Sequence, residues 1–163
     1  MSEAGSSSPD PAPRPAQMFR VPPPLLFLLA FVIGVGAERI APLAFGFPGR
    51  EGLGLLICLA GLAIGPGAAL RFALRGTTLN PFGEPSSLVA NGIYGWTRNP
   101  MYLGITVFYL GGVLLLGGLW PLVFLVVPLW ILDRVVIPHE EATMGRVFGT
   151  EYAAYCTRVR RWL

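Results

Sequence analysis

The sequence predicts an all-α, polytopic integral membrane protein with about four transmembrane helices. Two of these helices form a tight hairpin, and interfacial helices follow at the C-terminal end. Hydrophobic residues make up 53% of the chain and charged residues 13%, with a mean hydropathy of +0.60. Soluble domains are nearer a quarter charged, so much of this surface must face lipid. The 21 glycines and 16 prolines agree, because both are commoner in transmembrane helices.

Residues 1–21 are rich in Ser, Pro and Ala, and we expect a disordered tail there. Residues 22–70 then hold the first two transmembrane helices. The first apolar segment, 22–37, could instead be a cleaved signal peptide, because Arg14 and Arg20 precede it and small residues end it. A retained helix is favoured, since the rest of the chain is also apolar.

The second apolar segment, residues 52–70, is close to the ~20 residues needed to span a bilayer. Four glycines in it permit close contact between helices. They are Gly54, Gly61, Gly65 and Gly67. Because Pro66 lies between two of them, we expect the helix to kink or end there.

Residues 101–132 contain no charged side chain. A single helix of this length would measure ~48 Å, whereas the hydrocarbon core is ~30 Å thick. We therefore predict a helical hairpin that turns near Gly117-Gly118 and Pro121. Its second arm continues through Asp133 and Arg134 at the membrane interface.

The distribution of arginine predicts the orientation. Ten of the 12 basic residues, all arginines, fall on one side of this four-span topology, leaving only Arg39 and Arg50 on the other. The positive-inside rule then places both termini in the cytoplasm, and we expect the inner membrane of a bacterium. This topology brings the 71–100 loop and the 133–163 tail to the same face.

Each polar feature of that face also has a purely structural interpretation. Asn99 suits the N-cap of a helix that begins at Pro100, and the nearby aromatic rings could form an interfacial belt. Glu140 and Glu141, after Pro138, could complement a helix dipole.

The end of the chain predicts an amphipathic helix on the membrane surface. Phe148-Gly149 resembles a helix stop. Beyond it, aromatic and aliphatic residues recur at helical spacing, opposite Arg158 and Arg161. They are Tyr152, Tyr155, Val159 and Trp162.

Other classes of site are disfavoured. Cys58 and Cys156 are isolated, His139 is a lone histidine, and we expect no metal site. The net charge of +3 is scattered and predicts no nucleic-acid partner. The chain also lacks the strand–Gly-x-Gly-x-x-Gly–helix pattern of a Rossmann domain.

Four motifs occur together in one order: Arg-Asn-Pro-x-Tyr at 98–102, Glu-Glu at 140–141, Phe-Gly-x-x-Tyr at 148–152 and Arg-Val-Arg-Arg at 158–161. Because these motifs occur in this order, residues 77–163 resemble the isoprenylcysteine carboxyl methyltransferase family, a relative of the membrane phospholipid methyltransferases. The resemblance implies that residues 71–163 form the catalytic region of an S-adenosylmethionine-dependent methyltransferase. Its implied substrate is a lipophilic, lipid-like or prenylated molecule reached from the membrane lipids.

By match to the family motifs, the resemblance implies roles for individual residues. Arg134 and Glu140 are the catalytic candidates, and Arg134 and Arg158 the candidates to bind substrate. The cofactor-binding candidates are Ser86, Ser87, Leu88, Val89, Tyr94, Asn99, Pro100, Met101, Tyr102 and Glu140.

Two departures from the family pattern concern the methyl acceptor. Asn99 replaces a histidine found in the eukaryotic members, so it can form hydrogen bonds but cannot accept a proton. A family arginine expected to face the substrate carboxylate falls near Val136, and Arg134 lies about 200° away around an α-helix. The methylated atom, O, N or S, is left open. A lipid-substrate reductase using NADPH and a non-enzymatic membrane protein remain alternatives.

Overall fold

The computed structural model describes residues 21–74 and 87–163, which form helices and connecting turns. The elements are α1 (Pro23–Ile40), α2 (Arg50–Leu74), the 3₁₀ turn η1 (Gly92–Gly95), α3 (Pro100–Leu116), α4 (Trp120–Ile131), the π-helical segment η2 (Leu132–Val136) and α5 (Ile137–Arg158). No named strand occurs in these two ranges, which confirms the all-α prediction. Residues 1–20 of the predicted N-terminal tail and residues 75–86 of the 71–100 loop lie outside them.

Within the described residues, three helical runs are long and apolar enough to cross a membrane: Pro23–Ile40, Arg50–Arg71 and Trp120–Arg158. The fourth, α3, is apolar but shorter. The run from Trp120 to Arg158 has 39 residues, or ~58 Å of helix, nearly twice the hydrocarbon thickness. Only its apolar first half, α4 with η2, can cross the bilayer. The more polar α5 must therefore lie beyond it.

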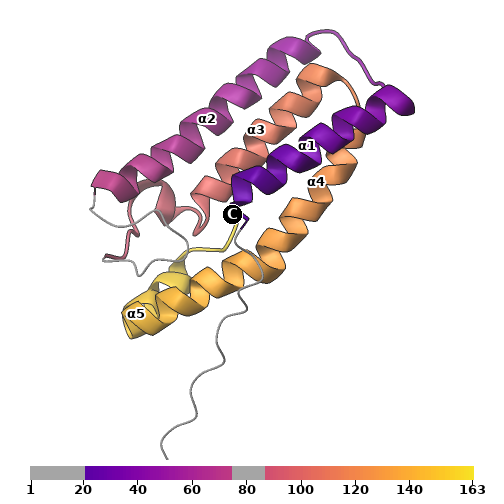
Figure 1. The fold of residues 1–163 in the computed structure, drawn as a ribbon. Coiled ribbons are helices and arrows are strands. Elements are labelled where there is room, and N and C mark those ends of the chain that lie inside the picture. Colours follow the sequence, from indigo (N-terminus) through magenta and orange to yellow (C-terminus); the bar gives the residue numbers. More distant parts are fainter. Residues whose placement is uncertain (1–20, 75–86) are drawn as a thin grey trace, which may run out of the picture.

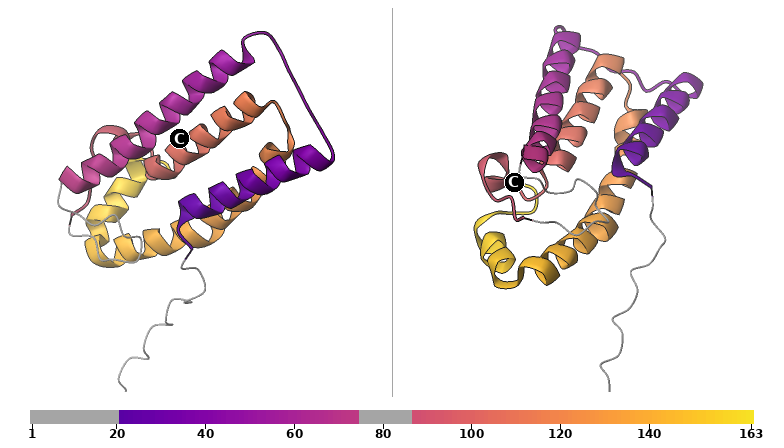
Figure 2. Two further views of the ribbon diagram at one scale, coloured as in Figure 1. Left: turned by 45° about the horizontal axis from the view of Figure 1, so that its top comes forward. Right: turned by 60° about the vertical axis from the view of Figure 1, so that its left-hand side comes forward.

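The four apolar helices form two antiparallel pairs, with α2 against α3 and α1 against α4 (Figure 1). Beyond η2, α5 turns beneath the end of the bundle where α2 ends and α3 begins (Figure 2). The C-terminal residues consequently return to the start of α3. This arrangement brings the two sequence-distant polar segments to the same end of the bundle, as predicted.

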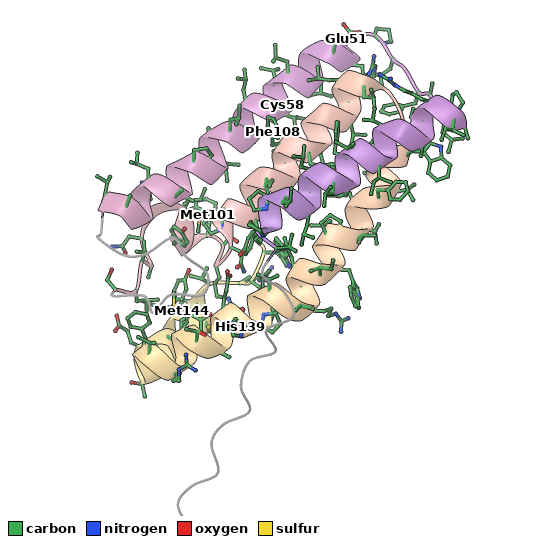
Figure 3. The ribbon with its side chains drawn as sticks, in the orientation of Figure 1. Glu51, Cys58, Met101, Phe108, His139 and Met144 are labelled. Carbon is green, nitrogen blue, oxygen red and sulfur yellow. The ribbon has the colours of Figure 1, made fainter. Side chains whose placement is uncertain are left out.

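The contact between α2 and α3 is a seam of small residues. A Cβ atom added to Gly61 would lie 2.7 Å from the carbonyl oxygen of Gly104, and one added to Gly104 would meet the backbone of Gly65. Farther along the seam, the Cys58 thiol donates to the Phe108 carbonyl at 3.5 Å, and the two side chains appear together in Figure 3. Backbones can approach this closely only where side chains are absent or small.

The predicted glycines behave differently from one another. Gly54 is close to α3, where an added Cβ would lie 3.0 Å from the Gly111 carbonyl oxygen, and Gly65 is in ordinary contact with α3. Gly67 faces open space, so its predicted role in the contact is wrong. Of the two outcomes expected at Pro66, an end of the helix is wrong because α2 continues to Leu74, and a kink stays a prediction. The missing N–H of Pro66 costs one hydrogen bond, and the surrounding helix accommodates that loss.

The predicted hairpin turn is confirmed. Helix α3 ends at Leu116 and Gly117 follows in the left-handed conformation (φ 73°), where a glycine avoids steric strain. Two charged residues stabilise this turn, one from the last turn of α1 and one from the start of α2. Glu38 accepts from the backbone N–H of Trp120 at the start of α4, whereas Arg50 donates to carbonyls in the last turn of α3. Each charge complements the dipole of the helix end that it meets.

Gly149 interrupts α5 with φ 50° and ψ −120°, which confirms the predicted break after Phe148. The predicted surface helix is correct only in part. Tyr152, Tyr155 and Val159 are buried together, but the helix ends at Arg158 and Val159 is extended. Trp162 packs instead against the main core, beside α3 and α4.

The glycine seam makes a testable prediction for stability. Gly61→Ala should lower the free energy of unfolding by about 1–3 kcal/mol, because its Cβ would overlap α3 backbone atoms. Gly67→Ala, on the same helix, is the matched control. It should be neutral or stabilising, because Ala is the better helix former. Unfolding by denaturing detergent, followed by circular dichroism, measures both, and equal values would refute the seam.

Candidate functional site

The site is built around the turn that precedes α3. Thr97 and Asn99 are buried, with 1% and 8% of their surface exposed. The Thr97 hydroxyl accepts from the backbone N–H of Asn99 at 3.1 Å and donates to the Arg161 carbonyl at 3.2 Å. Asn99 occupies the predicted N-cap position, but its side chain does not cap α3. Instead, Nδ2 donates to the same Arg161 carbonyl at 3.0 Å.

One hydrogen bond joins the start of α3 directly to α5. The Tyr102 hydroxyl donates to Oε1 of Glu140 at 2.6 Å, across 38 residues of sequence. Both side chains are half-buried. The structure thus brings together two of the predicted cofactor-binding residues from opposite ends of the hairpin.

The neighbouring carboxylate, Glu141, has different partners. Arg161 donates to its two oxygens at 3.2 and 2.6 Å, and Arg98 forms an ion pair with it at 3.3 Å. Arg161 also reaches Asp133 at 3.3 Å. The hydrogen bond from Arg161 to Glu141 raises the pKa of the guanidinium, as do the charges of both carboxylates. Arg161 therefore stays charged throughout the accessible pH range.

Tyr94 lies on the side of the turn that faces α2. It is 3% exposed and packs with Val89 against Ala68, beside the partly buried Met101. Burial raises the pKa of its hydroxyl, and the charges of Tyr155 and Glu140 raise it further, so Tyr94 is a neutral phenol. Its backbone carbonyl accepts from the Tyr155 hydroxyl at 2.7 Å, which fixes the turn to α5.

The remaining cofactor candidates surround this turn. Pro100 is fully buried at the first turn of α3, and Leu88 packs against the Tyr152–Tyr155 cluster. Ser86 lies outside the described residues. Figure 3 shows Met101 at the same end of the molecule as Met144 and His139 on α5, and far from Glu51.

The two predicted substrate arginines do not join this group. The Arg134 side chain is 71% exposed and pairs with Asp133 at 3.6 Å. Arg158 is exposed, and its Nε donates to the Ala154 carbonyl within α5. Their roles toward substrate stay predictions. In the described residues, no group of three or more His, Cys, Asp or Glu side chains is arranged to hold a metal ion.

Sequence reasoning missed the network that supports the site. Its members are Thr97, Arg98, Asp133, Glu141, Arg161 and Trp162, whose indole N–H donates to Asp133 at 3.3 Å. One signal was available: Arg98, Glu141 and Arg161 belong to the four motifs, and unpaired charges are costly at a membrane face.

Comparison with known proteins identifies the family. The family model for phospholipid methyltransferase matches residues 50–151, well over half of the chain. This chain belongs to the phospholipid methyltransferase family. The matched range includes the turn before α3, the hairpin and the Glu140–Glu141 pair.

Individual relatives carry names of the family that the motifs resemble. Protein-S-isoprenylcysteine O-methyltransferase of Schizosaccharomyces pombe is 35% identical over 72 residues, which are 44% of this chain and 30% of that protein. The Saccharomyces cerevisiae protein of the same name is 36% identical over 72 residues, again 44% of this chain and 30% of that protein. Protein-S-isoprenylcysteine O-methyltransferase B of Arabidopsis thaliana is 28% identical over 141 residues, 82% of this chain and 71% of that protein. The alignment thus spans less than a third of the two yeast proteins. No solved structure matches the chain.

Thr97 provides a test of the turn. Thr97→Val keeps the shape of the side chain but leaves the buried N–H of Asn99 without its acceptor. The free energy of unfolding should fall by about 1–3 kcal/mol. Thr97→Ser retains the hydroxyl and is the control, with an expected loss of less than about 1 kcal/mol. If the two variants unfold alike, the hydroxyl does not hold this turn.

Proposed function

We propose that this protein is an S-adenosylmethionine-dependent methyltransferase that acts on a lipophilic substrate at the cytoplasmic face of the membrane. The observation that supports it best is the hydrogen bond between Tyr102 and Glu140, which joins the two family motifs at one place. The names of the relatives favour methyl transfer over the reductase and non-enzymatic alternatives.

The residues of the site suit this cofactor. Asn99 has an amide for the polar edge of adenine, and the rings of Tyr94 and Tyr102 offer flat apolar faces. Glu140 has carboxylate oxygens for ribose hydroxyls or for the ammonium of the methionine part. Two buried polar atoms, Ser87 Oγ and Arg98 Nε, have no hydrogen-bond partner among the residues that the structure describes. Buried polar groups are nearly always paired, so a polar ligand in contact with them is a natural explanation.

When bound, S-adenosylmethionine supplies an electrophilic methyl group on a sulfonium. The chain's residues need only align the acceptor in line with that group and exclude water, if the acceptor is already an anion. Buried Val89 and Pro100 and the neutral Tyr94 suit water exclusion. In this proposal Glu140 binds and orients the cofactor, and no proton transfer through it is required.

The names of the relatives suggest an acceptor of the prenylcysteine class, with a carboxylate oxygen as the nucleophile. The family name suggests a phospholipid instead. Both would approach from lipid, and the outer faces of α1, α2 and α4 are rich in exposed aliphatic side chains. The arginines at the site end of the bundle outnumber Arg39 and Arg50 at the other end, which supports a cytoplasmic site.

A binding experiment tests the cofactor. Purified protein in detergent should bind S-adenosylhomocysteine saturably in calorimetry, and Asn99→Ala and Glu140→Ala should each weaken binding at least about tenfold. Arg146→Ala, an exposed residue of α5, is the control and should bind like the wild type. Binding of NADPH but not of S-adenosylhomocysteine would favour a reductase, and binding of neither would refute both enzymes.

A kinetic experiment tests the two exposed arginines. We expect Arg134→Ala and Arg158→Ala each to raise the KM of an S-farnesylcysteine with a free carboxylate about two- to fivefold, as for exposed ion pairs. The affinity for S-adenosylhomocysteine should not change. Two further substrates distinguish O- from N-methylation: the same acceptor with its carboxylate amidated, and vesicles of phosphatidylethanolamine. If both variants keep the wild-type KM, neither arginine binds the substrate.

A further inference from the structure

The last residues of the chain form a C-terminal strap, defined as residues 159–162, that crosses the turn before α3. The chain leaves the helix at Val159 and its carbonyls turn toward residues 97–99. The backbone N–H of Arg98 donates to the Arg160 carbonyl at 3.0 Å. The Arg161 carbonyl accepts from both Thr97 and Asn99. The strap is therefore hydrogen-bonded to the same turn that contains the cofactor candidate Asn99.

The Arg161 side chain extends the strap to α5. Its guanidinium bridges Glu141 and Asp133, and Trp162 donates to Asp133 from the next position. With Arg98, two positive and two negative charges alternate in this cluster, and the exposed Arg134 also pairs with Asp133 at its edge. Its arginine and glutamate side chains are only 17–33% exposed, so these ion pairs are better shielded from water than typical surface pairs.

This arrangement sets the orientation of the Asn99 amide. A carbonyl oxygen can only accept, so the amide group that meets the Arg161 carbonyl must be the NH₂. Oδ1 of Asn99 then points elsewhere, and within the described ranges no group donates to it. Asn99 is thereby oriented as an acceptor, which suits an exocyclic amino group such as that of adenine.

The same arrangement separates the roles of the two adjacent glutamates. Both Glu141 oxygens are engaged by arginines, which leaves little capacity for a ligand. Glu140 accepts only from Tyr102 among the described residues and so retains free lone pairs. The charged cluster holds the backbone of α5 at Glu141 and thereby fixes where Glu140 lies.

We propose that Arg161 is a positioning residue of the cofactor site. Its carbonyl orients the Asn99 amide, and its guanidinium with Arg98 holds Glu141 so that Glu140 faces the ligand. The inference rests on the proposed function, because it assigns the supporting residues of that same site. It also assigns Glu141 to support and Glu140 to binding.

The test compares neighbouring arginines of the strap. Arg161→Ala should weaken S-adenosylhomocysteine binding about tenfold and raise the KM for S-adenosylmethionine equally, without changing the KM of the lipophilic acceptor. Arg160→Ala is the matched control: it removes an exposed side chain of the same charge and keeps the backbone carbonyl. Arg161→Lys should restore most of the affinity, because an ammonium can still pair with Glu141.

A second measurement tests whether Arg161 and Glu141 act together on binding. Glu141→Gln alone should weaken binding to a similar extent, and the double variant with Arg161→Ala should be little worse than either single one. If Arg161→Ala does not fold, Glu141→Gln decides the question alone. Wild-type affinity in the folded Arg161 variant, or in Glu141→Gln, overturns the inference. If the inference is overturned but Glu140→Ala still abolishes binding, the proposed function stands. If the wild type binds no S-adenosylhomocysteine, the inference and the proposed function both fail.

Discussion

The close approach of α2 and α3 determines where the site can form. Gly61 and Gly104 leave no room for side chains between the two backbones, so the register of the helices is fixed within a narrow range. That register sets the height at which α3 begins relative to the end of α2. Tyr94 and Val89 can then pack on Ala68 of α2 while Tyr102, one turn into α3, still reaches α5.

The unpaired backbone groups at the helix ends are satisfied in different ways at the two ends of the bundle. A helix end exposes unpaired backbone groups, which are costly near lipid. At the hairpin end, Glu38 and Arg50 satisfy these groups directly. Glu38 also accepts from the backbone N–H of Leu43, and Arg50 also pairs with Glu51. At the site end, the C-terminal strap supplies carbonyls to the turn before α3, while the charged side chains pair with one another. This leaves Asn99 Oδ1 and Glu140 with capacity for a ligand.

Much of the fold follows from local sequence signals. The uncharged run of residues 101–132 predicts the hairpin because its length exceeds one span, and Gly117 marks the turn because only glycine is comfortable at that φ. The membrane pairing of Gly54 and Gly61 is likewise predicted. The path of residues 159–162 is not, because the spacing of Tyr152, Tyr155 and Val159 fits a helix equally well. Residues 159–162 are held in place by hydrogen bonds from the turn at residues 97–99 to the carbonyls of Arg160 and Arg161. These donors lie some sixty residues away in sequence, so local spacing does not reveal them.

The π-helical segment explains why Arg134 could not be placed from its spacing alone. A π turn makes i→i+5 hydrogen bonds, so it includes one residue more than an α turn and rotates everything that follows. Pro138 supplies a reason for it, since its ring would clash with the carbonyl of residue 134 in a regular α-helix. An angle counted on an ideal α-helix therefore fails across Leu132–Val136. With the π-helical segment in place, the Arg134 side chain faces outward. Asp133 and Glu141 both face Arg161, and Glu140 meets Tyr102.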